Sequence, residues 1–201
     1  MNRSLLIAAA AALPLLSGCA LLSSPEPVQM YHFGGQAPVE ARAPIAQPVA
    51  MGLRRIEMPQ ASRTDRLVGV TGSEVAYIKG ARWVSPADDL YTEALENAFA
   101  ARAQRVRLVG PRELTTAERS LDVDMRAFEA RYDAPGAAPS AVITARAQIL
   151  SREDRSVIAE RTFSVTRPAS ENRVSAIVQA FEAATADINA QIVDWADQNA
   201  G

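Results

Sequence analysis

Reactive side chains are scarce in this 201-residue sequence, which has one cysteine, Cys19, one histidine, His32, and one lysine, Lys79. A disulfide needs two cysteines, so the fold must depend on its hydrophobic core for stability. Nucleophilic catalysis needs a base beside the nucleophile, and the one histidine lies in a proline-rich stretch. A periplasmic hydrolase is therefore the least supported hypothesis, because a Ser-His-Asp or Cys-His site would have to assemble from a flexible segment.

Metal and phosphate sites lack support as well. Carboxylates alone would suit Ca²⁺ or Mg²⁺, but Asp122 and Asp124 alternate with apolar residues, as expected for the solvated face of a strand. Asp88 and Asp89 fit the first turn of a helix, where acidic side chains are favourable. The chain has no glycine-rich loop followed by the helix and lysine that bind phosphates. We predict no catalytic residue, no metal and no cofactor apart from a covalent lipid.

A basic excess and long apolar runs are absent too. The chain has 21 Lys and Arg against 23 Asp and Glu, and without its first 18 residues it has 20 against 23. Nucleic acid requires a basic patch or stripe, and an anionic lipid surface attracts polybasic segments, so this balance argues against both. No stretch beyond the N-terminus approaches the ~20 apolar residues of a transmembrane helix.

An apolar run of Leu, Ile and Ala follows Arg3 and ends in the tetrapeptide Leu16-Ser17-Gly18-Cys19. The positive start orients such a segment at the membrane, and the apolar part is too short to be a comfortable spanning helix. The small residues before the cysteine give a peptidase access to the backbone, and the thiol can accept a lipid. The pattern predicts a bacterial lipoprotein signal, cleaved between Gly18 and Cys19, with the lipid on Cys19. The alternative is a cleaved secretory signal with an accidental cysteine.

Several acyl chains on one residue anchor a protein stably without spanning the membrane. Ala20 follows the cysteine, whereas Asp at that position resembles the inner-membrane retention signal of Gram-negative bacteria. We therefore expect the periplasmic face of the outer membrane.

Residues 20–47 carry four of the chain's prolines and Pro48 follows directly, with little periodicity, which predicts an extended tether. At ~3.1 Å per residue this tether could reach about 85 Å. The aromatic stretch Met30–Phe33 is the part we expect to be ordered. We expect a signal over residues 1–18, a lipidated cysteine and tether over 19–47, and one domain over 48–201.

From Val49 on, the proline-rich composition gives way to regular spacing of apolar residues. The alternation of apolar and polar residues predicts short strands, and apolar residues at helical spacing predict a helix from about Pro86 to Arg102, capped by Ser85, and a terminal helix introduced by Pro168 and Ser170. The expected strands are 49–56, 66–70, 74–78, 81–84, 106–109, 121–127, 141–150 and 157–165, with a turn at Lys79-Gly80. We predict an α+β fold, a two-layer α/β sandwich in which two long helices pack on one face of a mixed sheet.

Two apolar features admit a binding role. Trp83, together with Tyr77, Arg82 and Tyr91, could form an exposed contact for a partner, since Trp, Tyr and Arg dominate binding hot spots. Alternatively, Trp83 is a core residue that covers the edge of the sheet, the interpretation we favour. The apolar stripe of the terminal helix could likewise dock a partner helix or an acyl chain, although packing on its own sheet is favoured.

Several diffuse motifs together resemble one known family. After the lipoprotein signal come the aromatic stretch Met30–Phe33, a proline- and arginine-containing stretch over 59–68, and the stretch Tyr77–Leu90, which is the most diagnostic. Strands ending in Arg161-x-Phe163 and a long C-terminal helix complete the pattern. The chain resembles the ABC-type transport auxiliary lipoproteins, which include PqiC-like outer-membrane lipoproteins.

The resemblance implies a non-enzymatic periplasmic lipoprotein that works with an ABC transporter and an MCE-domain protein. Such systems are thought to move lipids or other hydrophobic molecules between the two membranes and so support envelope integrity. The family has no catalytic residues to carry over, and self-association is left open. A lipoprotein that assembles an outer-membrane barrel or activates a cell-wall synthase is the alternative, because similar folds serve such roles.

Overall fold

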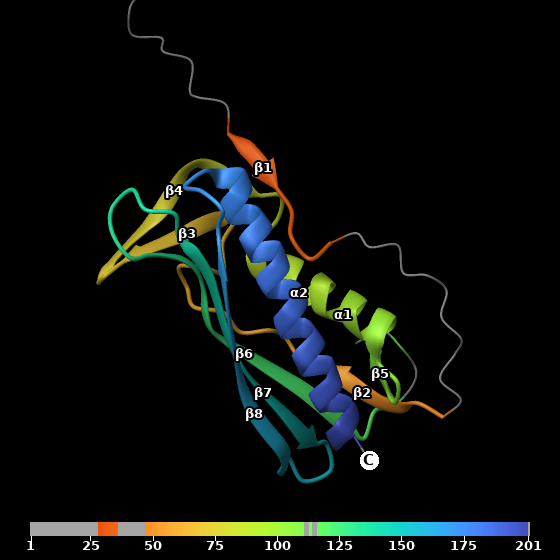
Figure 1. Cartoon of the computed structure of the whole chain (residues 1–201). Coiled ribbons are helices and arrows are strands. Elements are labelled where there is room, and N and C mark those ends of the chain that lie inside the picture. Colours follow the sequence, from red (N-terminus) through yellow and green to blue (C-terminus); the bar gives the residue numbers. More distant parts are fainter. Residues whose placement is uncertain (1–27, 36–46, 111–112, 114–115, 201) are drawn as a thin grey trace, which may run out of the picture.

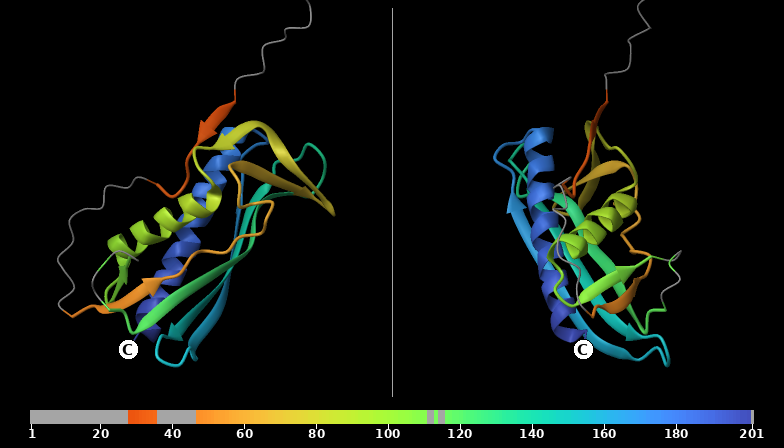
Figure 2. Two further views of the ribbon diagram at one scale, coloured as in Figure 1. Left: turned by 180° about the vertical axis from the view of Figure 1, so that it is seen from behind. Right: turned by 90° about the vertical axis from the view of Figure 1, so that its right-hand side faces the viewer.

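The computed structural model describes residues 28–35, 47–110, 113 and 116–200, and its two helices lie on one face of an eight-stranded mixed sheet (Figures 1 and 2). This arrangement confirms the predicted fold class. The strands are β1 (Gln29–Tyr31), β2 (Val49–Leu53), β3 (Arg66–Thr71), β4 (Glu74–Trp83), β5 (Val106–Val109), β6 (Arg119–Tyr132), β7 (Ser140–Ser151) and β8 (Val157–Pro168). The helices are α1 (Ala87–Arg102) and α2 (Val174–Asn199).

The 14-residue strand β6 is the axis of the sheet. Along one side it pairs antiparallel with β7, from Arg119 to Arg131. Its other side is shared by two parallel partners, because Arg119 also pairs with Met51 of β2 and Ala130 also pairs with Gly69 of β3. The sheet continues outward through β8 beyond β7, β5 beyond β2, and β4 and β1 beyond β3.

Small side chains on β7 bring α2 close to the sheet. Ala141, Ala145 and Ala147 are buried on the same face as Ile143 and Ile149, and the residues between them are partly exposed, as the predicted alternation requires. The apolar stripe of α2 packs over this face. The helix residues that form the stripe and are fully or almost fully buried are Ile177, Phe181, Ala184, Ile188, Ile192, Trp195 and Ala196. The stripe therefore packs on its own sheet, in agreement with the favoured interpretation.

The C-terminal end of α2 also forms hydrogen bonds with the loop that connects α1 to β5. One carboxylate, that of Asp197, accepts hydrogen bonds from the backbone N–H groups of Gln104, Arg105 and Val106 at 2.5, 3.0 and 2.9 Å. Beside it, the Arg102 guanidinium donates to both carboxylate oxygens of Asp194. These bonds satisfy backbone donors that the loop cannot pair within itself.

Two local predictions need correction. The expected turn at Lys79-Gly80 is absent, because β4 runs unbroken from Glu74 to Trp83. Gly80 instead has a φ of +75°, which glycine adopts without strain, inside an irregularity where one residue of β3 faces four of β4. The expected cap is also wrong: α1 begins at Ala87 with Pro86 as its N-cap, and no side chain caps it.

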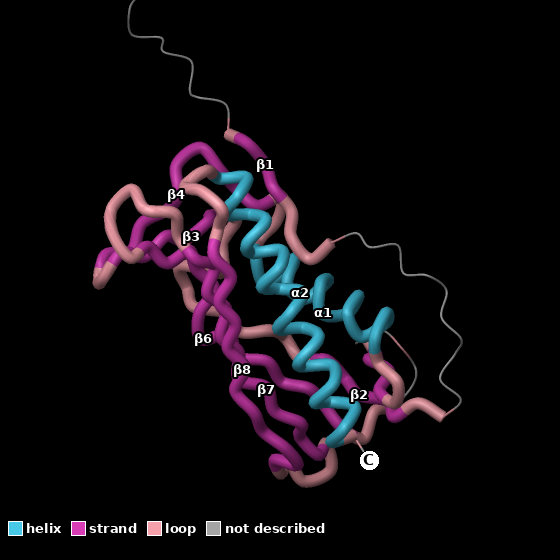
Figure 3. Tube along the Cα trace, in the orientation of Figure 1, coloured by secondary structure: helices cyan, strands magenta, loops and turns pink. Residues whose placement is uncertain are grey.

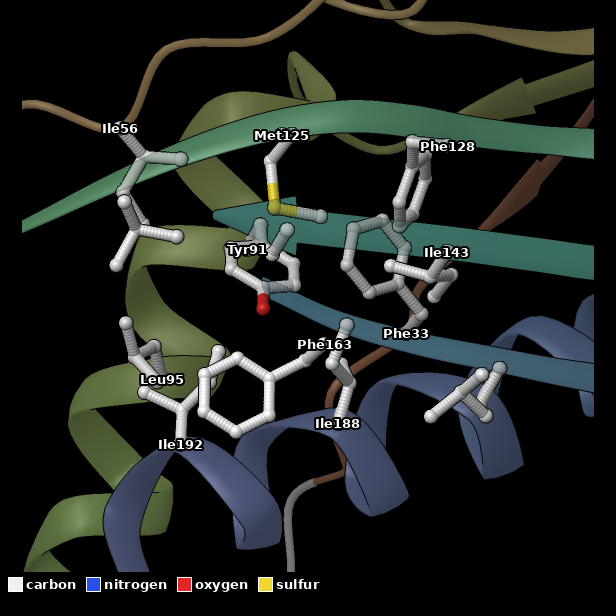
Figure 4. Packing of buried hydrophobic residues seen from close by; sticks show 14 of the residues in the cluster. Phe33, Ile56, Tyr91, Leu95, Met125, Phe128, Ile143, Phe163, Ile188 and Ile192 are labelled. Carbon is white, nitrogen blue, oxygen red and sulfur yellow. The ribbon is translucent and has the colours of Figure 1, made fainter. Parts of the chain in front are cut away.

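The aromatic stretch near the N-terminus is part of the domain and not of the tether. Gln29–Tyr31 pair in parallel with Ala81–Trp83 of β4, and the fully buried Phe33 follows (Figure 4). Its ring lies 4.8 Å from that of Trp83 and 5.1 Å from that of Phe128. The N–H of Gly34 then donates to Glu182 of α2 at 2.7 Å. The prediction that this stretch is ordered is correct.

This docking shortens the predicted tether. Cys19 lies outside the described residues, and only nine chain steps separate it from Val28, where the described chain begins. Nine fully extended residues span about 30 Å, far less than the predicted reach. In the part of the chain that the structure describes, no helix is long and apolar enough to cross a membrane.

We predict that Phe33→Ala lowers the free energy of unfolding by about 3–5 kcal/mol, because it leaves a cavity in the aromatic core. Urea unfolding followed by circular dichroism measures this loss. The control is Met30→Ala, three residues away but 54% exposed, for which we expect a change within about 0.5 kcal/mol. Equal small changes in both variants would show that the stretch is not docked.

Candidate functional site

The structure divides the four candidate contact residues into two pairs. Trp83 and Tyr91 are in the core, at 1% and 0% exposure, whereas Tyr77 is 43% exposed and Arg82 is partly exposed. Burial prevents Trp83 and Tyr91 from touching a partner of the folded domain, so their proposed contact role is corrected. Tyr77 and Arg82 stay candidates for contact with another molecule.

Strand alternation explains this division. On β4 the side chains of Ala81 and Trp83 point to the helices, so Arg82 between them points to the opposite face. Arg82 is paired with Met30 on β1 and with Arg66 on β3. Paired residues on neighbouring strands project from the same face, so these three side chains form a row across three strands.

The row continues along the β3–β4 hairpin. The Arg66 guanidinium lies 4.7 Å from the centre of the Tyr77 ring, a cation–π distance. Arg82 donates from Nη1 to the Asp65 carboxylate at 2.6 Å. We call this face the β1–β4 surface; its residues are Val28, Met30, Arg66, Val75, Tyr77, Arg82 and Val84.

Exposed apolar side chains concentrate on the β1–β4 surface. Among the described residues, seven large hydrophobic side chains are exposed, and five of them belong to it. The other two, Val157 and Ile158, lie at the start of β8, at the opposite end of the molecule, beside the C-terminal end of α2 (Figure 3). An amphipathic surface of this kind can bind another molecule.

The carboxylates considered from the sequence do not gather into a metal site in the described part of the chain. No cluster of three or more His, Cys, Asp or Glu side chains could hold a metal ion there. Asp122 and Asp124 form ion pairs with Arg54 and Arg126, at 3.7 and 2.6 Å, which is the solvated face that their alternation predicted. His32 is partly exposed at the end of β1.

Tyr91 is one of three described residues with a buried polar side-chain atom that lacks a hydrogen-bond partner. Its hydroxyl is buried without a hydrogen-bond partner, and burial raises the pKa of Tyr91 well above its usual value. The hydroxyl therefore stays protonated. Its surroundings are aromatic and aliphatic side chains (Figure 4), so it has no neighbour to which it could transfer a proton.

A groove lies between the two helices. The groove has a volume of about 270 Å³, and its lining includes five alanines of α1 and α2 together with Gly34 and Gly35. Thr185 and Asn189 also line it, and each has a buried side-chain oxygen without a hydrogen-bond partner. The small residues let the helices approach closely.

Sequence reasoning missed the other members of the β1–β4 surface. Met30 lies in the three-residue strand β1, where alternation has too few positions to define a face, and Val84 follows the last residue of β4. The signal that could have found them is parity: Val84 and Arg82 are two residues apart, as are Val28 and Met30. The pairing of Met30 with Arg82, however, depends on a parallel contact between distant segments.

Comparisons with known proteins agree on the family and the fold. A family model described as ABC-type transport auxiliary lipoprotein component matches residues 31–193. A solved DUF330 protein from Xanthomonas campestris has a TM-score of 0.70 at 25% identity, over 85% of this chain and 96% of that one. The comparison with curated proteins finds no match.

Two further solved structures share the fold at lower identity. An uncharacterized protein has a TM-score of 0.64 at 16% identity, covering 85% of this chain and 99% of that one. Hypothetical protein CT253 from Chlamydia trachomatis has a TM-score of 0.53 at 9% identity, covering 77% and 98%. Identities this low show the fold alone.

We predict that Tyr91→Phe raises the free energy of unfolding by about 1 kcal/mol, because it removes a buried hydroxyl that makes no hydrogen bond. Chemical denaturation measures the change. Tyr77→Phe is the matched control, since its hydroxyl lies on the surface, and it should alter stability by less than about 0.5 kcal/mol. A loss of stability in Tyr91→Phe would mean that the hydroxyl is paired in solution.

Proposed function

Because the chain belongs to the ABC-type transport auxiliary lipoprotein family, we propose that it is the outer-membrane-anchored, periplasmic member of an ABC and MCE-type system. This system moves lipids or other hydrophobic molecules between the membranes. The protein is not an enzyme in this proposal; it positions and engages the transporter. The observation that carries the proposal is the family match over residues 31–193, which includes Phe33 and most of α2.

The geometry of the chain supports one orientation of the domain between the two membranes, with the β1 end toward the outer membrane. Lipid on Cys19 would hold Val28 within about 30 Å of the outer membrane. The 26 residues of α2 extend about 39 Å, from the end of the domain that carries β1 to the opposite end (Figure 3). The turn between β7 and β8 lies at that opposite end, so in this proposal it faces the periplasm and the inner membrane.

The transporter-facing end in this proposal carries Val157 and Ile158. Both are exposed at the start of β8, an edge strand that pairs only with β7 in the described sheet. Exposed apolar residues beside an unpaired strand edge are suited to adding a strand or segment of another protein.

We expect Cys19→Ser to prevent lipidation and to remove the protein from the outer-membrane fraction. Membrane fractionation followed by immunoblotting measures both changes. The matched variant is Ala20→Asp, which keeps the cysteine and should move the protein to the inner-membrane fraction. Unchanged fractionation of Cys19→Ser would refute the lipid anchor and with it the proposed location.

A photocrosslinking residue at Val157 or Ile158 should capture an MCE-domain protein in cells. The control position is Glu93, exposed on the outer side of α1, from which we expect much weaker capture. Mass spectrometry of the trapped product identifies the partner. Capture of only a second copy of the chain would indicate self-assembly, and capture of a β-barrel assembly factor or a cell-wall synthase would contradict the transport proposal.

A further inference from the structure

The β1–β4 surface has the composition of a membrane-interface binding site. Met30 and Val84 present apolar side chains that are about half exposed. Tyr77 has an aromatic ring with a polar tip, the kind of side chain enriched at the level of lipid headgroups. Arg66 and Arg82 lie among them, and a guanidinium carries five N–H donors that suit phosphate oxygens. Their observed contacts are a ring face for Arg66 and the Asp65 carboxylate for Arg82.

The β1–β4 surface lies close in the chain to the proposed lipid anchor, which favours the membrane as its binding partner. Val28 and Met30 belong to the surface, and Val28 is the first described residue, nine steps from Cys19. A lipid on Cys19 therefore holds the β1 end within about 30 Å of the bilayer. Val157 and Ile158 lie at the other end of a domain whose helix α2 alone is about 39 Å long. When the chain is anchored, the β1–β4 surface is the exposed apolar face that can reach lipid.

The lipid anchor also allows a small surface to keep the domain bound to the bilayer. An anchored domain is confined near the bilayer at a high effective concentration, so a contact that would be weak for a free protein is occupied most of the time. Partial insertion of a few apolar side chains supplies free energy in proportion to the area removed from water. The five exposed hydrophobic residues of the β1–β4 surface are compatible with such a shallow contact.

We propose that the β1–β4 surface docks on the phospholipid surface of the membrane that holds the lipid anchor. Met30, Val84 and Tyr77 enter the headgroup region, and Arg66 and Arg82 contact lipid phosphates. In the docked domain the helices lie on the side of the sheet that faces away from the bilayer. This inference rests on the lipid anchor of the proposed function, but it does not depend on which transporter component binds the opposite end.

Site-specific fluorescence on the lipidated protein tests the docking. In that protein the lipid blocks Cys19, the only native cysteine, so Met30→Cys and Val84→Cys each offer one free thiol for an environment-sensitive dye. The matched controls are Val157→Cys and Ile158→Cys, which are similarly exposed. Each labelled protein is reconstituted in vesicles of phosphatidylethanolamine and phosphatidylglycerol, and the emission of its dye is recorded. The reference is the emission of the same dye at the same position in the unlipidated Cys19→Ser variant, in buffer without detergent or vesicles.

We expect dyes at positions 30 and 84 to shift their emission to shorter wavelength in vesicles and to be protected from an aqueous quencher. Dyes at 157 and 158 should show neither change. Equal behaviour at both ends, or no shift at 30 and 84, overturns the proposal. A shift at 30 and 84 that needs added MCE-domain protein also overturns it, in favour of a protein partner.

Two controls keep the result interpretable. Circular dichroism of each labelled variant checks that it is folded, which the exposure of all four positions leads us to expect. Loss of membrane association on Cys19→Ser is measured separately, so failure of the anchor and failure of the docking are distinguishable. Crosslinking at the opposite end tests the transport proposal without using the β1–β4 surface.

Discussion

The burial of Phe33 is the interaction on which the arrangement of this protein depends. The chain has only 11 aromatic residues, and five of them form one cluster contributed by five separate elements. Phe33 follows β1, and the others come from β4, α1, β6 and α2; they are Trp83, Tyr91, Phe128 and Phe181. The cluster joins a short N-terminal segment to both layers of the fold, without a disulfide. It thereby fixes where the first described segment of the chain lies on the domain.

The long elements could be predicted from the sequence because their patterns repeat over many residues. The predicted alternation covers seven to ten residues of β6, β7 and β8, and the apolar stripe runs along the 26-residue helix α2. The short elements could not be fixed in this way. Lys79-Gly80 has the composition of a turn, but pairing with β3 and β1 keeps β4 extended and turns the glycine into a bulge. Tertiary pairing overrides local propensity at such positions.

Only part of the candidate site could be predicted from the sequence, because adjacent residues of a strand face opposite sides of the sheet. The aromatic and basic residues between Tyr77 and Tyr91 suggest one contact surface in the sequence, but neighbours on a strand face opposite sides of the sheet. Arg82 and Trp83 are adjacent in sequence yet lie on the outer face and in the core. Which of them faces outward depends on where the helices pack, and Met30 joins Arg82 only through a parallel pairing over 50 residues apart.

The bulge at Gly80 separates two phases of alternation within one strand. Trp83 keeps its inward direction through its pairing with Tyr31, while the hairpin tip around Gly72 follows its own register with β3. Length changes at the tip therefore leave the aromatic core in phase, whereas loss of one residue after Gly80 would turn Trp83 to the outside. The outer hairpin can therefore change in length at little cost to the packing of the aromatic core.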